Sequence, residues 1–105
     1  MEIAEEDKSA IKSIVNIQLQ NIPNLVQFSK NENVRENLGI SNSFDFVMGI
    51  VYDGMLASIN NYFLQKMKIQ QPIREQFMEI MEVATSETLS SLSEIKQEIK
   101  KQLNN

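Results

Sequence analysis

The sequence predicts an all-α fold, an antiparallel bundle of four or five helices that forms a single domain over residues 1–105. Two observations predict it. Apolar residues recur at helical spacing along most of the chain, so each segment can bury one stripe against its neighbours. In addition, only three glycines and two prolines interrupt the 105 residues, which permits long helices.

The pattern of residues 4–39 predicts two or three helices of short to medium length. A first helix is expected over about residues 4 to 21. Its first turn contains the acidic residues Glu5, Glu6 and Asp7, which suit the positive end of the helix dipole. Pro23 should end or kink this helix, because proline lacks an amide proton and clashes with the preceding turn. A short helix should follow to about residue 30, and one or two further turns should close at Gly39.

A long central helix is expected over residues 43–68. Its apolar residues cover so much of its circumference that it should lie in the middle of the bundle. The alternative is a β-hairpin, because Asp53-Gly54 is a common two-residue turn between strands. The helix is favoured, since the apolar stripe passes through Gly54 without a change of period.

A second long helix is expected over residues 72–103, with Pro72 at its first position. Its apolar side chains stay on one side at a mean spacing of about 3.7 residues, close to that of a straight helix. This stripe should face the core, and it includes Phe77, Ile80, Ala84 and Ile95. Residues 85–93 are rich in serine and threonine, which are poor helix formers, and Ser91 begins a capping-box sequence. A break near Ser90 is therefore the alternative, but the unbroken phase of the stripe favours one helix.

The composition excludes most familiar kinds of catalytic and metal site. The chain has no histidine and no cysteine, so it offers no His/Cys zinc site, no Ser-His-Asp couple and no thiol redox centre. Glu75, Glu79 and Glu82 lie opposite the apolar stripe and have no histidine to complete a di-metal site, so a solvated ridge is expected. An enzyme would have to use carboxylates with Tyr52 or Tyr62. We expect no enzyme, no cofactor and no metal.

The charge of the chain bears on its partners and its location. The net charge is −4, with 10 basic residues against 14 acidic ones, which disfavours nucleic-acid binding. The acidic N-terminal segment differs from a signal peptide, and together with the lack of cysteine it predicts a cytoplasmic protein. No uncharged stretch approaches the roughly 20 apolar residues of a membrane-spanning helix.

The first functional hypothesis is a homodimeric scaffold or regulatory protein. At 1.5 Å per residue the two long helices measure about 38 and 48 Å, so the last helix should reach beyond the central one. Its apolar seam would then need another cover, either the N-terminal helices or a second copy of the chain. The seam consists of Leu92, Ile95, Ile99 and Leu103. The sequence thus predicts an interaction module that dimerises through this seam or binds another protein there.

The alternative function is a carrier of a small molecule or lipid. Small residues in a central helix can leave space for a ligand, and methionine side chains adapt to its shape. The candidate cavity residues are Met48, Gly49, Gly54, Met55 and Phe63. A simpler interpretation is that the methionines fill the core and that the glycines let a neighbouring helix approach closely.

Overall fold

The computed structural model describes residues 1–105 and contains helices but no strands. The elements are α1 (Glu5–Lys30), α2 (Glu32–Leu38), α3 (Ser43–Lys66), α4 (Arg74–Thr88), the 3₁₀ turn η1 (Leu89–Ser91) and α5 (Leu92–Leu103). The predicted all-α class and helix bundle are confirmed. The alternative hairpin at Asp53-Gly54 is wrong, because α3 runs through both residues. None of the helices has the length and apolarity that crossing a membrane requires.

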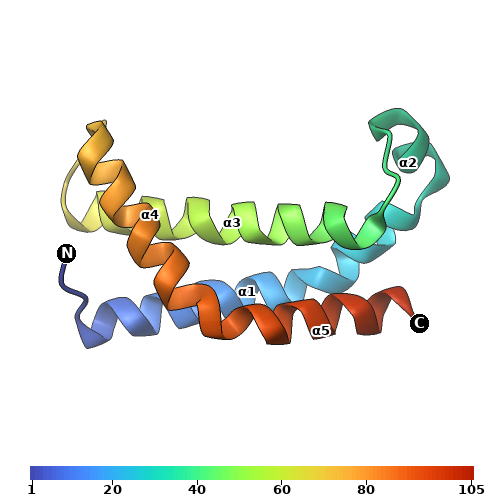
Figure 1. Ribbon diagram of the computed structural model, residues 1–105, viewed down its shortest axis with the longest axis horizontal. Helices are drawn as coiled ribbons and strands as arrows, with labels where there is room; N and C mark the ends of the chain where they lie inside the picture. Colours follow the sequence, from blue (N-terminus) through green and yellow to red (C-terminus); the bar gives the residue numbers. More distant parts are fainter.

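Three helices lie along the long axis of an elongated molecule that measures 43 × 26 × 16 Å. Figure 1 shows α3 running opposite to α1, while α5 runs in the same direction as α1. α4 crosses this layer obliquely, and α2 lies at the end where α1 passes into α3. The two termini are at opposite ends of the molecule (Figure 1).

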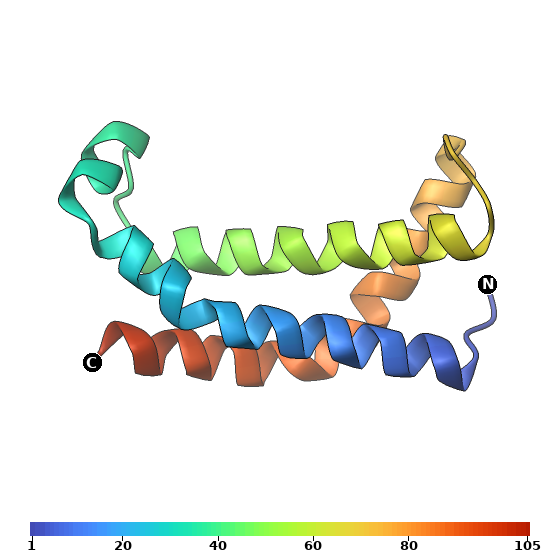
Figure 2. The same ribbon diagram turned by 180° about the vertical axis from the view of Figure 1, so that it is seen from behind.

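α1 is one continuous helix of 26 residues, although Pro23 lies inside it. Of the two outcomes expected at this proline, the end with a separate helix up to residue 30 is therefore wrong, and the kink is the one that fits the structure. Figure 2 shows the last part of α1 turned away from the direction of its first part. A proline inside a helix costs about 3 kcal/mol. Ile22 and Val26 on either side of it are fully buried against α3 and α5, and this packing opposes that cost.

Polar caps begin α2 and α3, and a glycine ends α2. The side chain of Asn31 accepts a hydrogen bond from the Val34 amide, and that of Asn42 accepts one from the Asp45 amide. Gly39 has a φ of 67°, a left-handed conformation that glycine adopts without steric cost. The predicted closure of this segment at Gly39 is confirmed.

The expected last helix is divided into α4 and α5. Pro72 precedes α4 by two positions, so it is not the first helical residue. The helix breaks after Thr88, which is fully buried and donates its hydroxyl to the carbonyl of Ala84 at 2.7 Å. Such a back-bond often bends a helix. The single continuous helix is thus wrong, and the alternative break is right, although Ser91 makes no side-chain cap.

The core consists of two clusters at different ends of the α1–α3 pair, and the break at η1 lets α5 cover one and α4 the other. The cluster with α5 contains Val15, Ile22, Val26, Val47, Val51, Met55, Ile95 and Ile99. The cluster with α4 contains Ile11, Ile59, Phe63, Ile80 and Ala84. The break between α4 and α5 therefore lets the last part of the chain cover two separate apolar stretches of α1 and α3.

Candidate functional site

The residues of the predicted dimer seam pack inside the chain. Ile95 and Ile99 have no exposed surface and belong to the cluster shared by α1, α3 and α5. Leu92 and Leu103 are partly buried against the same cluster. Of the two covers expected for this seam, the structure has the N-terminal one, because α1 lies beside α5 and covers it. The dimer prediction thus loses the observation on which it was based.

The residues of the predicted ligand cavity do not line one cavity. Met55 and Phe63 are fully buried, one in each core cluster, and fill space instead of enclosing it. Met48 and Gly49 line an open groove on the surface, some distance along α3 from Phe63. For Met55 the simpler interpretation, that methionine fills the core, is right.

Gly54 leaves space for a side chain of the neighbouring helix α1. A Cβ atom at this position would lie 2.9 Å from Nε2 of Gln18, which comes from α1. Gly49, one turn earlier, has nothing within 4 Å of such an atom. The interpretation of a glycine that admits a neighbouring helix therefore fits Gly54, whereas Gly49 faces open space.

An apolar groove separates α3 from α4 on the surface. Its volume is about 350 Å³. Its lining residues are Asp53, Leu56, Ala57 and Asn60 of α3 with Phe77 and Met81 of α4. Phe77 was expected in the core but is 43% exposed, because the apolar stripe of α4 is wider than the face that α3 covers.

A second groove, of about 510 Å³, continues around the side of α4. Its lining residues are Met78, Met81, Glu82, Thr85, Ser86 and Leu89. Met81 lines both grooves, so the two are neighbours. Met78 is 48% exposed and Leu89 64% exposed. For Met78 the core-filling interpretation is therefore wrong.

A third groove, of about 430 Å³, lies between α3 and α5. Its lining residues are Asp45, Met48, Gly49, Tyr52, Leu92 and Lys96. Tyr52 lies one helical turn from Leu56 of the first groove, so both grooves follow the same side of α3. We call the surface formed by the residues of these three grooves the α3–α4 flank.

The charged groups of the α3–α4 flank are mostly acidic. Asp45, Asp53 and Glu82 are exposed there, against the single cation of Lys96. The wall of the first groove also contains Oδ1 of Asn60, which is buried and accepts no hydrogen bond within the chain. The flank thus combines an apolar floor, an acidic rim and one unpaired acceptor.

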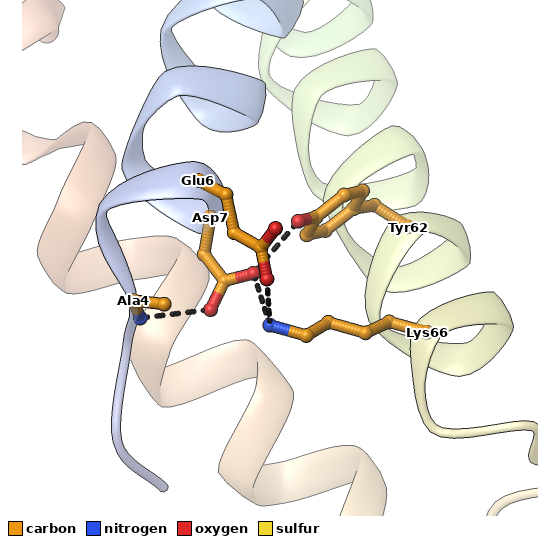
Figure 3. A network of polar contacts seen from close by, with 5 residues as sticks. All are labelled: Ala4, Glu6, Asp7, Tyr62 and Lys66. Carbon is orange, nitrogen blue, oxygen red and sulfur yellow. Dashed lines mark hydrogen bonds and ion pairs between the residues drawn. The ribbon is translucent and has the colours of Figure 1, made fainter.

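The other notable polar arrangement lies where the start of α1 meets the end of α3, and its Asp7 is only 1% exposed. One of its oxygens accepts hydrogen bonds from Lys66 Nζ at 2.6 Å and from the Tyr62 hydroxyl at 2.7 Å. Its other oxygen accepts one from the Ala4 amide at 2.9 Å. Lys66 also lies 3.3 Å from a carboxylate oxygen of Glu6. Figure 3 shows these groups converging between the start of α1 and the end of α3.

The charges of this network change the acidity of its members. The Lys66 ammonium, followed by the Tyr62 hydroxyl, lowers the pKa of Asp7 to about 2, although burial acts in the opposite direction. The hydrogen bond with Asp7 is also the main cause that raises the pKa of Tyr62 and the pKa of Lys66. Both oxygens of Asp7 are occupied, and no groove is lined by any of these three residues. The arrangement fastens α1 to α3 and leaves no room for a substrate.

Sequence reasoning missed the Asp7 network because it interpreted each charge locally. Asp7 was assigned to the helix dipole of the first turn. Lys66 lies in the last turn of α3, where a cation equally suits the dipole. The available signal was topological: if two helices are antiparallel, the start of one and the end of the other meet, so opposite charges there can pair.

Comparisons of the chain with protein-family models, with curated proteins and with solved structures each gave no match. The function is therefore argued from the geometry of the chain. The Asp7 network is closed and internally saturated, whereas the α3–α4 flank is open and apolar. The flank is the stronger candidate for a functional surface.

Proposed function

We propose that this chain is a non-enzymatic helical interaction module that binds a partner through the α3–α4 flank. The observation that carries the proposal is the exposure of Phe77 and Met78 on α4, whose other face is fully buried, and of Leu89 in the η1 turn that follows it. Neighbouring apolar grooves with exposed apolar side chains of this kind mark association sites on soluble proteins. Hydration of these side chains is unfavourable, so a partner that covers them gains free energy.

The shape of the flank suits a helical partner segment. The first groove lies between α3 and α4, and its floor presents Leu56 from one helix and Phe77 and Met81 from the other. An amphipathic helix that lays its apolar side chains into such a groove is a common mode of recognition. Met78 and Met81 have flexible, polarisable side chains that can adjust to the partner.

The buried ionisable groups support a binding role over catalysis. A carboxylate with a pKa of about 2, such as Asp7, is a weak proton acceptor at neutral pH. The flank itself contains exposed acids but no cluster of groups that would activate one of them. A carrier function is also less well supported, because a ligand site usually encloses most of its ligand and these grooves lie open on the surface.

An unbiased peptide selection tests the docking role. A displayed library of random peptides, each about 16 residues long, is selected against the full chain, since a segment of that length spans about 24 Å as a helix. Enriched peptides are then measured against Met78→Glu and against Ile17→Glu. Ile17 is 55% exposed on α1 and lines none of the grooves, so it makes a matched control.

We expect the enriched peptides to lose at least about tenfold in affinity for Met78→Glu, because a carboxylate in an apolar contact is strongly unfavourable. Ile17→Glu should bind as the unchanged chain does. Equal binding to all three proteins would show that the peptides dock elsewhere and would remove the α3–α4 flank as the functional surface. Circular dichroism verifies that both variants keep the helical fold.

A further inference from the structure

The acidic rim and the apolar floor together specify the chemistry of the partner. We propose that the α3–α4 flank binds a basic amphipathic helix of another protein, with a cationic side chain next to Asp53 and a hydrogen-bond donor at Asn60. This inference rests on the docking role proposed above. It adds the charge of the partner and the spacing of the two polar residues that the partner presents.

The charge of the flank selects against the other possible occupants. Asp53 borders the first groove and Glu82 borders the second, and both residues are exposed. A second copy of this chain would bring a net charge of −4 to this acidic surface. An anionic membrane would be repelled in the same way. A helix with lysine or arginine along its edges meets complementary charge instead, which favours both encounter and specificity.

Asn60 supplies the second requirement. Its Oδ1 atom is buried in the groove wall and lacks a donor within the chain. That oxygen is shielded from solvent, so a donor reaches it only when the Asn60 side chain turns into the groove. A partner that provides an N–H group there then removes the cost of the unpaired acceptor and gains affinity. Lysine, arginine, asparagine and glutamine side chains all carry such a donor.

The spacing of the two polar groups sets the register of the partner. Asp53 and Asn60 are seven residues apart on the same side of α3, which corresponds to about 10 Å along the helix axis. A partner helix roughly aligned with α3 would therefore present its cation and its donor seven residues apart. Leu56 lies between these two positions, so apolar side chains should fill the intervening turn of the partner.

Three synthetic helical peptides test the charge of the partner. Each has about 18 residues, which gives a helix of about 27 Å, and all three have the same leucine face. The polar positions are all lysine in the first peptide, all glutamine in the second and all glutamate in the third. Fluorescence anisotropy measures their binding to the full chain at about 0.15 M salt, which screens distant charges. We expect the lysine peptide to bind about tenfold more tightly than the glutamine peptide, and the glutamate peptide to bind most weakly.

Charge-removing variants of the chain locate the attraction. The double variant Asp53→Asn with Glu82→Gln should weaken binding of the lysine peptide about fivefold or more and leave the glutamine peptide unchanged. The matched control is Glu32→Gln with Glu36→Gln, which removes the same charge from α2, away from the flank. If the control weakens binding equally, the attraction is a general effect of net charge and the inference is overturned.

The variant Asn60→Leu tests the hydrogen bond at the groove wall. It removes an acceptor that has no partner in the chain, so the melting temperature should stay the same or rise. Binding of a lysine peptide should weaken about threefold or more, because the donated hydrogen bond is lost. Unchanged peptide affinity in a folded Asn60→Leu variant would remove Asn60 from the recognition site.

The outcomes distinguish a failure of the inferred basic partner from a failure of the docking role on which it rests. If Met78→Glu abolishes binding of all three peptides but their charge makes no difference, the docking role stands and the basic partner is wrong. If Met78→Glu affects none of them, the docking role itself fails. A solution mass near twice 12.1 kDa that Met78→Glu reduces to the monomer mass would place a second copy in the grooves and overturn the proposal.

Discussion

The hydroxyl of Tyr62 donates a hydrogen bond of 2.7 Å to the buried carboxylate of Asp7, across 55 positions of the sequence. The bond joins the first turn of α1 to the end of α3, and Lys66 adds the charge that a buried carboxylate requires (Figure 3). This end of the bundle is therefore held by polar contacts as well as by the apolar cluster around Phe63.

We expect Tyr62→Phe to lower the free energy of unfolding by about 1.5–3 kcal/mol, the range for a hydrogen bond to a charged group. The substitution keeps the ring, which contacts Phe63 edge to face at 5.1 Å between ring centroids. Urea denaturation followed by circular dichroism measures the change. Tyr52→Phe serves as the control, because Tyr52 lies in an open groove, and it should change stability by less than about 0.5 kcal/mol. Equal effects of the two substitutions would contradict the role of the Asp7 bond.

The Asp7 network also predicts how stability depends on pH at the acidic end. The pKa of Asp7 is about 2 in the folded chain, below the value near 4 of an unfolded aspartate. A lowered pKa contributes stability above the unfolded value, and the contribution is lost as the pH falls through the folded value. The difference in stability between the unchanged chain and Asp7→Asn should therefore shrink between about pH 4 and pH 2. Urea midpoints of both proteins at several pH values measure it. A constant difference would show that Asp7 is not held in its charged form.

At the alkaline end the sign is reversed. The pKa of Lys66 and the pKa of Tyr62 are both raised by Asp7, so their contribution is complete below their unfolded values near 10. It is lost as the pH rises through the folded values. We expect the unchanged chain to lose stability above about pH 10 and Asp7→Asn to lose less. The same denaturation series extended to alkaline pH decides this, and parallel losses in the two proteins would contradict it.

Periodicity predicted the parts of this fold that depend on a single helix. The buried face of the last segment was correct at Ile80, Ala84 and Ile95, because a side chain four residues along a helix stays on the same face. α3 was predicted over its whole length for the same reason. The acidic residues Glu75 and Glu79 were also correctly expected on the outside.

The features that depend on two or three helices were not predictable in this way. Pro23 stays inside a helix because packing on both sides of it outweighs its local preference. The weak helix propensities of residues 85–93 did not decide whether the last helix breaks there. The break between α4 and α5 depends instead on the two separate core clusters that these helices cover. Which apolar residues remain outside, such as Met78, depends on how far α4 diverges from its neighbours. This information is absent from the pattern of any one helix.

The two central glycines of α3 should respond differently to alanine. Gly49→Ala should stabilise the chain by about 0.5–1 kcal/mol, because alanine favours the helix and nothing lies within 4 Å of the added methyl group. Gly54→Ala should stabilise less, since the methyl group would press on the Gln18 amide at 2.9 Å. Thermal and urea denaturation of the pair measure the difference. If Gly54→Ala stabilises as much as Gly49→Ala, the contact between the Gln18 side chain and Gly54 imposes no cost and this prediction is wrong.

The apolar seam of α5 offers the sharpest test of the fold against the dimer hypothesis. Ile95→Glu combined with Ile99→Glu places two carboxylates in a core cluster that has no exposed surface at either position. Burying an unpaired charge is unfavourable by several kcal/mol, which is comparable to the whole stability of a small domain. We therefore expect the double variant to lose cooperative unfolding and most of its helical circular dichroism.

The control for this variant is Ile73→Glu, because Ile73 is 61% exposed before α4 and its replacement should leave the fold intact. Light scattering on the same samples gives the mass of each protein. If the double variant is instead a well-folded monomer and the unchanged chain is a dimer, the seam lies between two copies. The packing of α5 against α1 would then be wrong. If the variant unfolds while Ile73→Glu keeps its structure and the unchanged chain has the mass of a monomer, Ile95 and Ile99 belong to the core of a single chain, because an obligate dimer would also unfold but would show twice the mass.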